Sequence, residues 1–391
     1  MARKQTALEQ HIAVFGESGS GKTVLLSSFY GATQEPQYSR EHLYRLYADD
    51  TGVGNRLHQN YLGMKQEAQA PPATRFESTA YSFSIKLKED SNAKRVRGRP
   101  FDAMRLVWHD YPGEWFEQDA SGPAEQARRV DGFRSLLGSD VALFLVDGQR
   151  LLDYAGEEQR YLKSLLGNFR NSLLSLKGEL LRGGEPLIRF PRIWIMALSK
   201  SDLLPETDVY AFRDLMIGKV AEEINELREV LSEFVAGSEA LAVGEDFLLL
   251  SSAKFETGRI DVDTRVGVEL MLPLAAMLPF ERHVRWARTK QLPGKVAESL
   301  VGAGAIGVTA LAGALLGNRR LPGPLRLVQG AVGGLVSKEA VDQAARLAGD
   351  ALKSMNAGAQ ARHDYLAATL TQFKLDLARG EQERVLLRSP R

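Results

Sequence analysis

The chain has 391 residues, of which 44% are apolar and 25% charged, so it is neither disordered nor collagen-like and allows one large domain or two ordinary ones. Its 50 Lys and Arg residues balance 49 Asp and Glu residues, and because the net charge is only +1 we expect no nucleic-acid partner. The absence of cysteine excludes disulfides, thiolate metal sites and a cysteine nucleophile, and fits a reducing compartment. The polar N-terminus does not fit a signal peptide, so we expect a cytoplasmic protein.

Short apolar runs that alternate with helical stretches predict an α/β domain over residues 8–290. The first strand, 11–15, is followed by a Gly-rich loop and a helix from Thr23. The stretch 31–72 is polar and mixed, with two Asp-rich turns. Further strands are predicted at 81–88, 101–109, 141–146, 193–198 and 247–250, and further helices at about 151–182 and 210–234. Runs without polar residues indicate a mainly parallel sheet covered by helices on both faces.

Residues 291–391 differ in composition and predict a helical C-terminal module. Two uncharged Gly- and Ala-rich segments, joined by a turn-rich link, predict a close helical hairpin at about 300–336. Between Glu281 and Arg326, eight Lys or Arg residues oppose two Glu residues, a local charge of +6. Three alternatives follow: a hairpin that packs on protein, reversible attachment to an anionic membrane, or insertion into the membrane.

Residues 16–23 match the phosphate-binding pattern G-x-x-x-x-G-K-[ST] in full. In such a loop, successive backbone N–H groups and the start of a helix surround an anion. Lys22 would reach the β- and γ-phosphates, and the Thr23 hydroxyl would bind Mg²⁺. The alternative is a Gly-rich turn without a ligand. The predicted nucleotide-binding residues here are Gly16, Glu17, Ser18, Gly19, Ser20, Gly21, Lys22 and Thr23.

Further motifs occur in the order found in P-loop GTPases. The sequence Asp110-Tyr111-Pro112-Gly113 resembles the D-x-x-G motif, which implies that Asp110 holds Mg²⁺ through water and that the Gly113 amide meets the γ-phosphate. The switch I threonine, a metal ligand in that family, should precede the first strand of the hairpin formed by 81–88 and 101–109. We assign it to Thr79, with Thr74 and Thr51 as weaker alternatives; an ordinary loop threonine is the other reading.

Two later segments resemble the base-reading motifs of the same family. Ser199-Lys200-Ser201-Asp202 is similar to N-K-x-D, which implies that Asp202 accepts the N–H groups of guanine and that the Lys200 stem lies over the base. Ser199 replaces the usual Asn or Thr; its hydroxyl can still tie the loop to the P-loop, but the departure puts guanine preference in question. Ser252-Ala253-Lys254 resembles the S-A-K element, in which the Ala backbone N–H contacts the guanine oxygen.

The whole set resembles a Ras-like, translation-factor-class P-loop GTPase. Residues 110–115, D-Y-P-G-E-W, also resemble the bacterial YcjX-like P-loop proteins; a distinct actinobacterial-style GTPase family is the alternative. This resemblance implies a bacterial cytoplasmic protein, in one reading peripheral to the inner membrane. Glu114 stands where the family usually has a glutamine that orients water, so it is either catalytic or a structural part of switch II.

These motifs predict a GTP-binding switch protein that hydrolyses GTP slowly, with GTP or GDP and Mg²⁺ as cofactors. Its partners would be a protein effector or activating protein, or an anionic membrane that the C-terminal module contacts. One rival is an ATPase, which Ser199 favours. The other is a nucleotide-dependent scaffold or membrane module with negligible turnover, which Glu114 favours.

Overall fold

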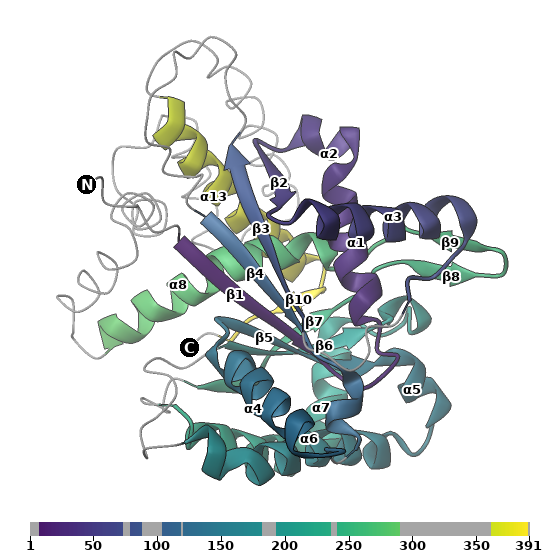
Figure 1. Ribbon diagram of the computed structural model, residues 1–391, viewed down its shortest axis with the longest axis vertical. Coiled ribbons are helices and arrows are strands. Elements are labelled where there is room, and N and C mark those ends of the chain that lie inside the picture. The colour runs from purple at the N-terminus through teal and green to yellow at the C-terminus, as the bar shows by residue number, and fades with distance from the viewer. Residues whose placement is uncertain are drawn as a thin grey trace.

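The computed structural model describes residues 8–72, 79–87, 104–118, 120–181, 193–235, 241–289 and 361–389. Their centre is an eight-stranded sheet with the order β10-β7-β6-β5-β1-β4-β3-β2 (Figure 1). Its strands are β1 (Leu8–Phe15), β2 (Tyr44–Ala48), β3 (Thr79–Leu87), β4 (Met104–Asp110), β5 (Val141–Asp147), β6 (Ile193–Ser199), β7 (Ala242–Leu249) and β10 (Leu386–Leu387).

The inner strands β7, β6, β5, β1 and β4 are parallel to one another, whereas β3, β2 and β10 pair antiparallel. Because parallel strands all end at the same edge of a sheet, the loops after β1, β4, β5, β6 and β7 come together there. The predicted P-loop, D-x-x-G and base-reading motifs follow four of these strands. The fold therefore brings segments from distant parts of the chain to one edge.

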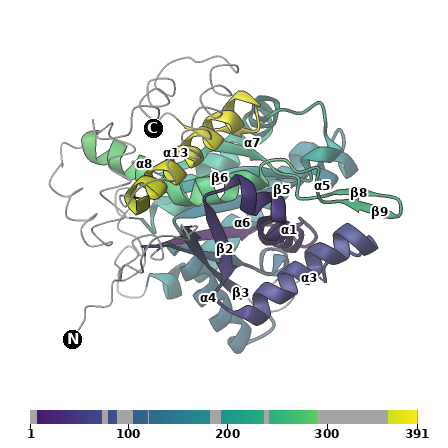
Figure 2. The ribbon, with the colours of Figure 1, turned by 90° about the horizontal axis from the view of Figure 1, so that it is seen from above.

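Helices cover both faces of the sheet, as the sequence predicted (Figure 2). On one face, α1 (Lys22–Gln34), α8 (Met271–Thr289) and α13 (Ala361–Gln382) share a core with the strands. On the other face lie α4 (Pro123–Gly138), α6 (Glu158–Leu180) and α7 (Val209–Ser232). Strands β5 and β6 are buried along their whole length, which explains their uninterrupted apolar sequences. The predicted α/β P-loop fold is confirmed.

The mixed stretch 31–72 contains regular structure that its sequence did not reveal. It forms α2 (Pro36–Glu41), the edge strand β2 and the long helix α3 (Thr51–Glu67). Asp50 caps α3, because its side chain accepts a hydrogen bond from the Val53 backbone N–H at 2.9 Å. Helix α3 carries three glycines and buries few of its side chains, so its apolar pattern is weak.

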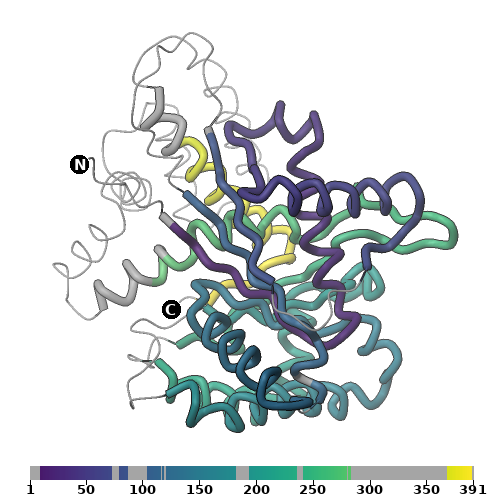
Figure 3. Tube along the Cα trace, viewed as in Figure 1, coloured from purple at the N-terminus to yellow at the C-terminus, as the bar shows by residue number. Residues whose placement is uncertain are grey.

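Helix α13 and strand β10, which belong to the predicted C-terminal module, pack on the α/β core. Helix α13 lies beside α8, far from it in sequence (Figure 3), and β10 pairs with β7. The buried Arg282 guanidinium of α8 pairs with Asp246 of β7 at 2.5 Å, and Asp246 also accepts the Ser389 backbone N–H. Arg282 is therefore not one of the surface charges of the predicted basic flank, a correction to that count.

The predicted hairpin at 300–336 lies outside the described residues, as does everything between 290 and 360. The boundary at 290 thus stays a prediction. Within the described part of the chain, no helix combines the length and the hydropathy needed to cross a membrane.

Candidate functional site

The P-loop wraps between β1 and α1, and its glycines permit the wrap. Gly21, the residue before the helix, has φ +90°, a left-handed conformation that side chains with a Cβ rarely adopt. Lys22, 9% exposed, folds back over the loop. Its Nζ donates to the carbonyl oxygens of Gly16 at 2.8 Å and Glu17 at 2.9 Å. These two hydrogen bonds hold the Lys22 ammonium group against the loop.

Burial lowers the pKa of the Lys22 ammonium, and nearby carboxylates, first among them that of Asp110, act in the opposite direction. For Glu17, burial is again the main cause, and it raises the pKa of the carboxyl, reinforced by the Glu117 carboxylate. The P-loop thus holds one desolvated cation close to several carboxyl groups. An anionic ligand would find a site where charge is weakly screened by water.

Asp110, Thr79 and Thr23 are the oxygen-bearing residues assigned to the metal. Asp110 ends β4 and is 1% exposed, and Thr79 pairs with it directly across the antiparallel β3–β4 ladder. Thr79 is thus the first residue of its strand rather than a residue before it. Thr23 is the second residue of α1. A carboxylate with hydroxyls is a hard oxygen donor set, which fits Mg²⁺. The exposed Thr51 starts α3, and Thr74 lies outside the described residues.

The segment after Asp110 lies directly on the P-loop. It includes the short helix η1 (Gly113–Phe116). A Cβ atom on Gly113 would overlap the backbone of Glu17 and Ser18, so only glycine fits this contact. Four residues later, the Glu117 carboxylate accepts the Ser18 backbone N–H at 2.7 Å. One P-loop donor is therefore held by a carboxylate of this chain, a contact that the sequence did not predict.

The buried Arg129 holds the same segment, 113–118, through its backbone carbonyl groups. Arg129 of α4 donates to the carbonyl oxygens of Trp115 at 3.2 Å and Gln118 at 2.5 Å, and it pairs with Glu125. Trp115 itself is 2% exposed and packs on Gly132, where a Cβ would overlap the indole ring. Segment 113–118 is thus positioned by specific contacts. Glu114 lies within it, partly exposed.

The predicted base-reading loop after β6 begins with a strained residue. Lys200 has φ +53°, a left-handed conformation that is unusual for a residue with a side chain. Its ammonium pairs with the buried Asp147 at 2.8 Å, at the end of β5. This ion pair holds the Lys200 stem along the cavity described below. No motif assigns a role to Asp147.

Asp202 follows on the short helix η2 (Ser201–Leu203) and is held by the next loop. The Ser251 hydroxyl donates to Asp202 Oδ1 at 2.7 Å, and the Ser201 backbone N–H donates to the Leu250 carbonyl at 3.0 Å. The sequence suggested that the Ser199 hydroxyl ties its loop to the P-loop, but the structure shows a different contact. Its hydroxyl instead donates to the Val146 carbonyl of the neighbouring strand β5 at 3.3 Å.

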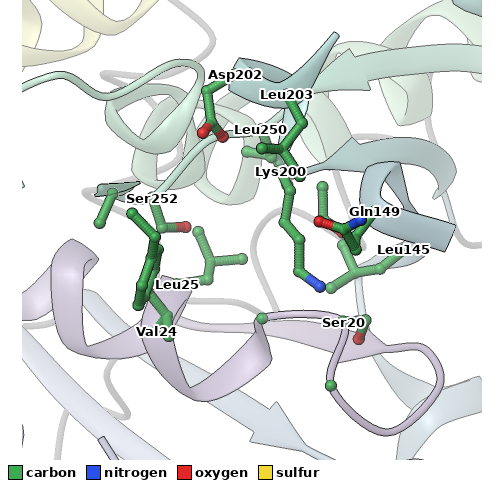
Figure 4. Close-up of a pocket in the computed structure, with 15 residues that line it drawn as sticks. Ser20, Val24, Leu25, Leu145, Gln149, Lys200, Asp202, Leu203, Leu250 and Ser252 are labelled. Carbon is green, nitrogen blue, oxygen red and sulfur yellow. The ribbon is translucent and has the colours of Figure 1, made fainter. Parts of the chain in front are cut away.

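These loops enclose one cavity of about 400 Å³ (Figure 4). Side chains of Lys200 and Gln149 lie on one side, and those of Val24 and Ser252 on the other. Of the predicted nucleotide-binding residues, the cavity is lined by Gly19, Ser20, Gly21, Lys200, Asp202, Ser252 and Ala253. Lining residues that sequence reasoning missed include Val24, Leu145, Gln149, Leu203 and Phe255. Val24 and Leu145 are apolar positions of predicted elements, and none of the five belongs to a motif.

Lys254, the last residue of the S-A-K element, differs from its neighbours. It starts β8 (Lys254–Glu256) and does not line the cavity. Its ammonium pairs with Glu256 at 2.9 Å on the outside of the hairpin that β8 forms with β9 (Arg259–Asp261). The element therefore contributes Ser252 and Ala253 to the cavity, but not the Lys254 side chain.

Comparison with known proteins agrees with this geometry. Residues 10–240, more than half of the chain, match the model of the family described as Double-GTPase 2. The chain belongs to the Double-GTPase 2 family. This confirms the predicted P-loop GTPase relationship, and the narrower likeness to YcjX-like proteins is consistent with it. As a member of a GTPase family, this Double-GTPase 2 protein is a GTP-binding GTPase.

Other comparisons add little to the family match. Among solved structures, this Double-GTPase 2 chain is similar to the GTPase-like domain of Saccharomyces cerevisiae Ski7, which was crystallised bound to GTP. The two share 13% identity with a TM-score of 0.29, over 63% of this chain and 43% of the yeast chain. The chain thus spans less than half of that relative's length. No curated protein matches significantly.

Proposed function

We propose that this protein is a guanine-nucleotide switch, which binds GTP with Mg²⁺, hydrolyses it slowly, and signals the bound state through segment 113–118. The observation that carries this proposal is the shared cavity. Phosphate-binding residues such as Gly21 and base-reading residues such as Asp202 line the same space, although they are far apart in sequence. A nucleotide has its phosphates and its base at opposite ends, and both kinds of group are met in this cavity.

In the proposed complex, the P-loop N–H groups and Lys22 hold the β- and γ-phosphates, and Asp202 accepts the N–H groups of guanine. Ser251 supports this role, because its hydroxyl fixes one Asp202 oxygen and thereby orients the carboxylate. Thr23, Asp110 and Thr79 would hold Mg²⁺. The metal supplies positive charge that neutralises the phosphates.

Slow hydrolysis follows from the charges around segment 113–118. Glu114 stands where a glutamine would orient the attacking water, and Glu117 also faces the P-loop. Both carboxylates lie close enough to Lys22 to oppose the lowering of its pKa. They would repel a γ-phosphate, and they cannot donate a hydrogen bond to it while ionised. Turnover would then depend on an activating protein that supplies a cation.

The switch itself would be the Glu117–Ser18 contact. Gly113, the residue expected to meet the γ-phosphate, lies on the peptide that carries the Ser18 N–H. A γ-phosphate bound there would compete with the Glu117 carboxylate for the same donor. GTP would therefore displace segment 113–118 from its present position, whereas GDP would leave it in place.

The partner of the switch would bind the C-terminal region of the chain. Residues 290–360 lie outside the described residues, and the basic flank of the sequence supports contact with a protein effector or an anionic membrane surface. Flotation of the full chain with anionic vesicles, in GTP and in GDP, tests the membrane form. An absence of binding in both states would leave a protein effector.

Calorimetry of the full chain with GTP, GDP and ATP tests the nucleotide assignment. We expect binding of GTP and GDP with Mg²⁺, weak binding of ATP, and no binding of any nucleotide by Lys22→Ala. ATP affinity equal to that for GTP would favour the ATPase rival. Unchanged affinity in Lys22→Ala would remove the assignment of the P-loop altogether.

A further inference from the structure

An exposed aromatic ring lines the nucleotide cavity. Phe255, in β8, is 52% exposed, more than any other large apolar side chain in the described part of the chain. It belongs to the cavity wall together with Val24, Lys200 and Asp202. Ligand cavities are lined mainly by apolar and aromatic side chains, so the position of this ring in the cavity wall makes it a contact for a ligand.

The exposure of Phe255 does not come from a loosely attached hairpin. Its cross-strand partner, Ile260, is 6% exposed, and Ile260 and Val262 pack with Ala253 in a satellite core. Helix α3 completes that core with Tyr61 and Met64, both fully buried. The hairpin is therefore anchored on the face that carries Ile260, and Phe255, paired directly with Ile260, lies on that same face and in the lining of the cavity.

We propose that Phe255 is one wall of a purine clamp, whose other wall is the stem of Lys200. This inference rests on the proposed nucleotide binding and adds a residue that no motif assigns. Ser252 and Lys200 lie on opposite sides of the cavity (Figure 4), and Phe255, three residues after Ser252 in β8, also lines it. The ion pair with Asp147 keeps the Lys200 stem on its side. A flat base entering between them would stack on the ring while its edge meets Asp202.

A clamp of this kind has a distinctive selectivity. Every purine has a π-face, so stacking on Phe255 would support adenine and guanine alike. Selection of guanine would remain with Asp202. The clamp would not act on the phosphates, because these bind at the P-loop. Loss of Phe255 should therefore weaken all purine nucleotides and leave both the GTP-to-ATP ratio and the affinity for a base-free polyphosphate unchanged.

Calorimetry of the full-length Phe255→Ala variant tests the clamp, with GDP, GTP and inorganic tripolyphosphate as probes. We expect GDP and GTP affinities to fall roughly 5- to 100-fold, with tripolyphosphate affinity unchanged. Phe255→Tyr should restore binding because it restores the ring, whereas Phe255→Leu, which keeps apolar bulk without a π-face, should not. Tyr47→Ala, an exposed aromatic of β2 outside the cavity, is the matched control and should bind as the wild type does.

The possible failures are distinguishable. Wild-type-like GDP affinity in Phe255→Ala or Phe255→Leu would overturn the clamp and leave the proposed function standing. Equal losses for GDP and tripolyphosphate would also overturn it, because they would show damage to the whole site. A wild type that binds tripolyphosphate but neither GDP nor GTP would instead overturn the proposed function.

Discussion

The backbone N–H of Ser18 donates to the Glu117 carboxylate at 2.7 Å, which joins the P-loop to a segment 99 residues away. A carboxylate of this chain thus occupies a P-loop donor. Arg129 and Trp115 hold the segment in place behind this contact. A γ-phosphate that binds here would have to displace the Glu117 carboxylate from the Ser18 N–H. The charge of Glu117 is therefore the property to test.

The first prediction concerns that charge. Glu117→Gln should bind GTP about tenfold more tightly while GDP affinity changes little, because a hydrogen bond to a charged group is worth about 1.5 kcal/mol or more and only GTP has to displace it. Competition binding of the two nucleotides measures the ratio. The control is Glu157→Gln, an exposed carboxylate just before α6. An unchanged ratio of GTP affinity to GDP affinity in Glu117→Gln would show that Glu117 and the γ-phosphate do not compete for the Ser18 N–H.

The second prediction concerns base selection. Asp202→Asn should lose roughly 100-fold or more in GTP affinity and gain affinity for xanthosine triphosphate, because the amide presents a donor where guanine needs an acceptor. Ser251 can still donate to the amide oxygen, so the loop should keep its shape. Asp131→Asn, on the exposed face of α4, is the matched control. If Asp202→Asn loses affinity for GTP and gains none for xanthosine triphosphate, Asp202 has a structural role.

The third prediction concerns turnover. The wild type should hydrolyse GTP at a rate on the order of 10⁻³ s⁻¹ or slower without a partner. Glu114→Gln should be faster if the side chain faces the attacking water, since glutamine can both accept and donate hydrogen bonds. Single-turnover phosphate release measures both rates. A fast wild type would contradict the proposal, and an unchanged variant would place Glu114 in a structural role.

The sequence predicted the fold where burial is uniform and missed it where burial is partial. Strands β5 and β6 have no exposed positions, so their apolar runs are unmistakable. Strand β2 is five residues long and lies at the sheet edge, with alternate positions exposed. A helical C-terminal module was predicted, but the place of α13 in the core was not. Contact between helices that are distant in sequence, such as α13 and α8, leaves no local pattern.

The candidate site divides in the same way. Motif residues such as Lys22 and Asp202 were predicted because phosphate and base recognition require fixed residue types at fixed spacing. Glu117, Asp147 and Phe255 act through their positions in space. A carboxylate or an aromatic residue at a strand end or on a hairpin is common in any sequence, so nothing local distinguishes these three. Only the fold shows that they reach the P-loop, Lys200 and the cavity.

The last prediction concerns acid stability and the residue before Asp110. His109 Nε2 lies 2.9 Å from His11 Nδ1, and the Ser135 hydroxyl lies 3.0 Å from its other nitrogen. Burial, together with the neighbouring His11, lowers the pKa of His109 to about 4 from an ordinary value of 6.5. The folded protein therefore keeps His109 neutral at pH values where the unfolded chain already binds a proton.

Since unfolding then takes up a proton, stability should be fully present near neutral pH and should fall as the pH drops from about 6.5 toward about 4. The loss is about 2 to 3 kcal/mol at the acid end. His109→Gln, which keeps a hydrogen-bonding side chain but cannot titrate, should flatten this slope, whereas His58→Gln on α3 should retain it. Urea unfolding at about pH 7 and about pH 5 gives the comparison. A slope equal to that of the wild type in His109→Gln would show that other groups govern acid stability.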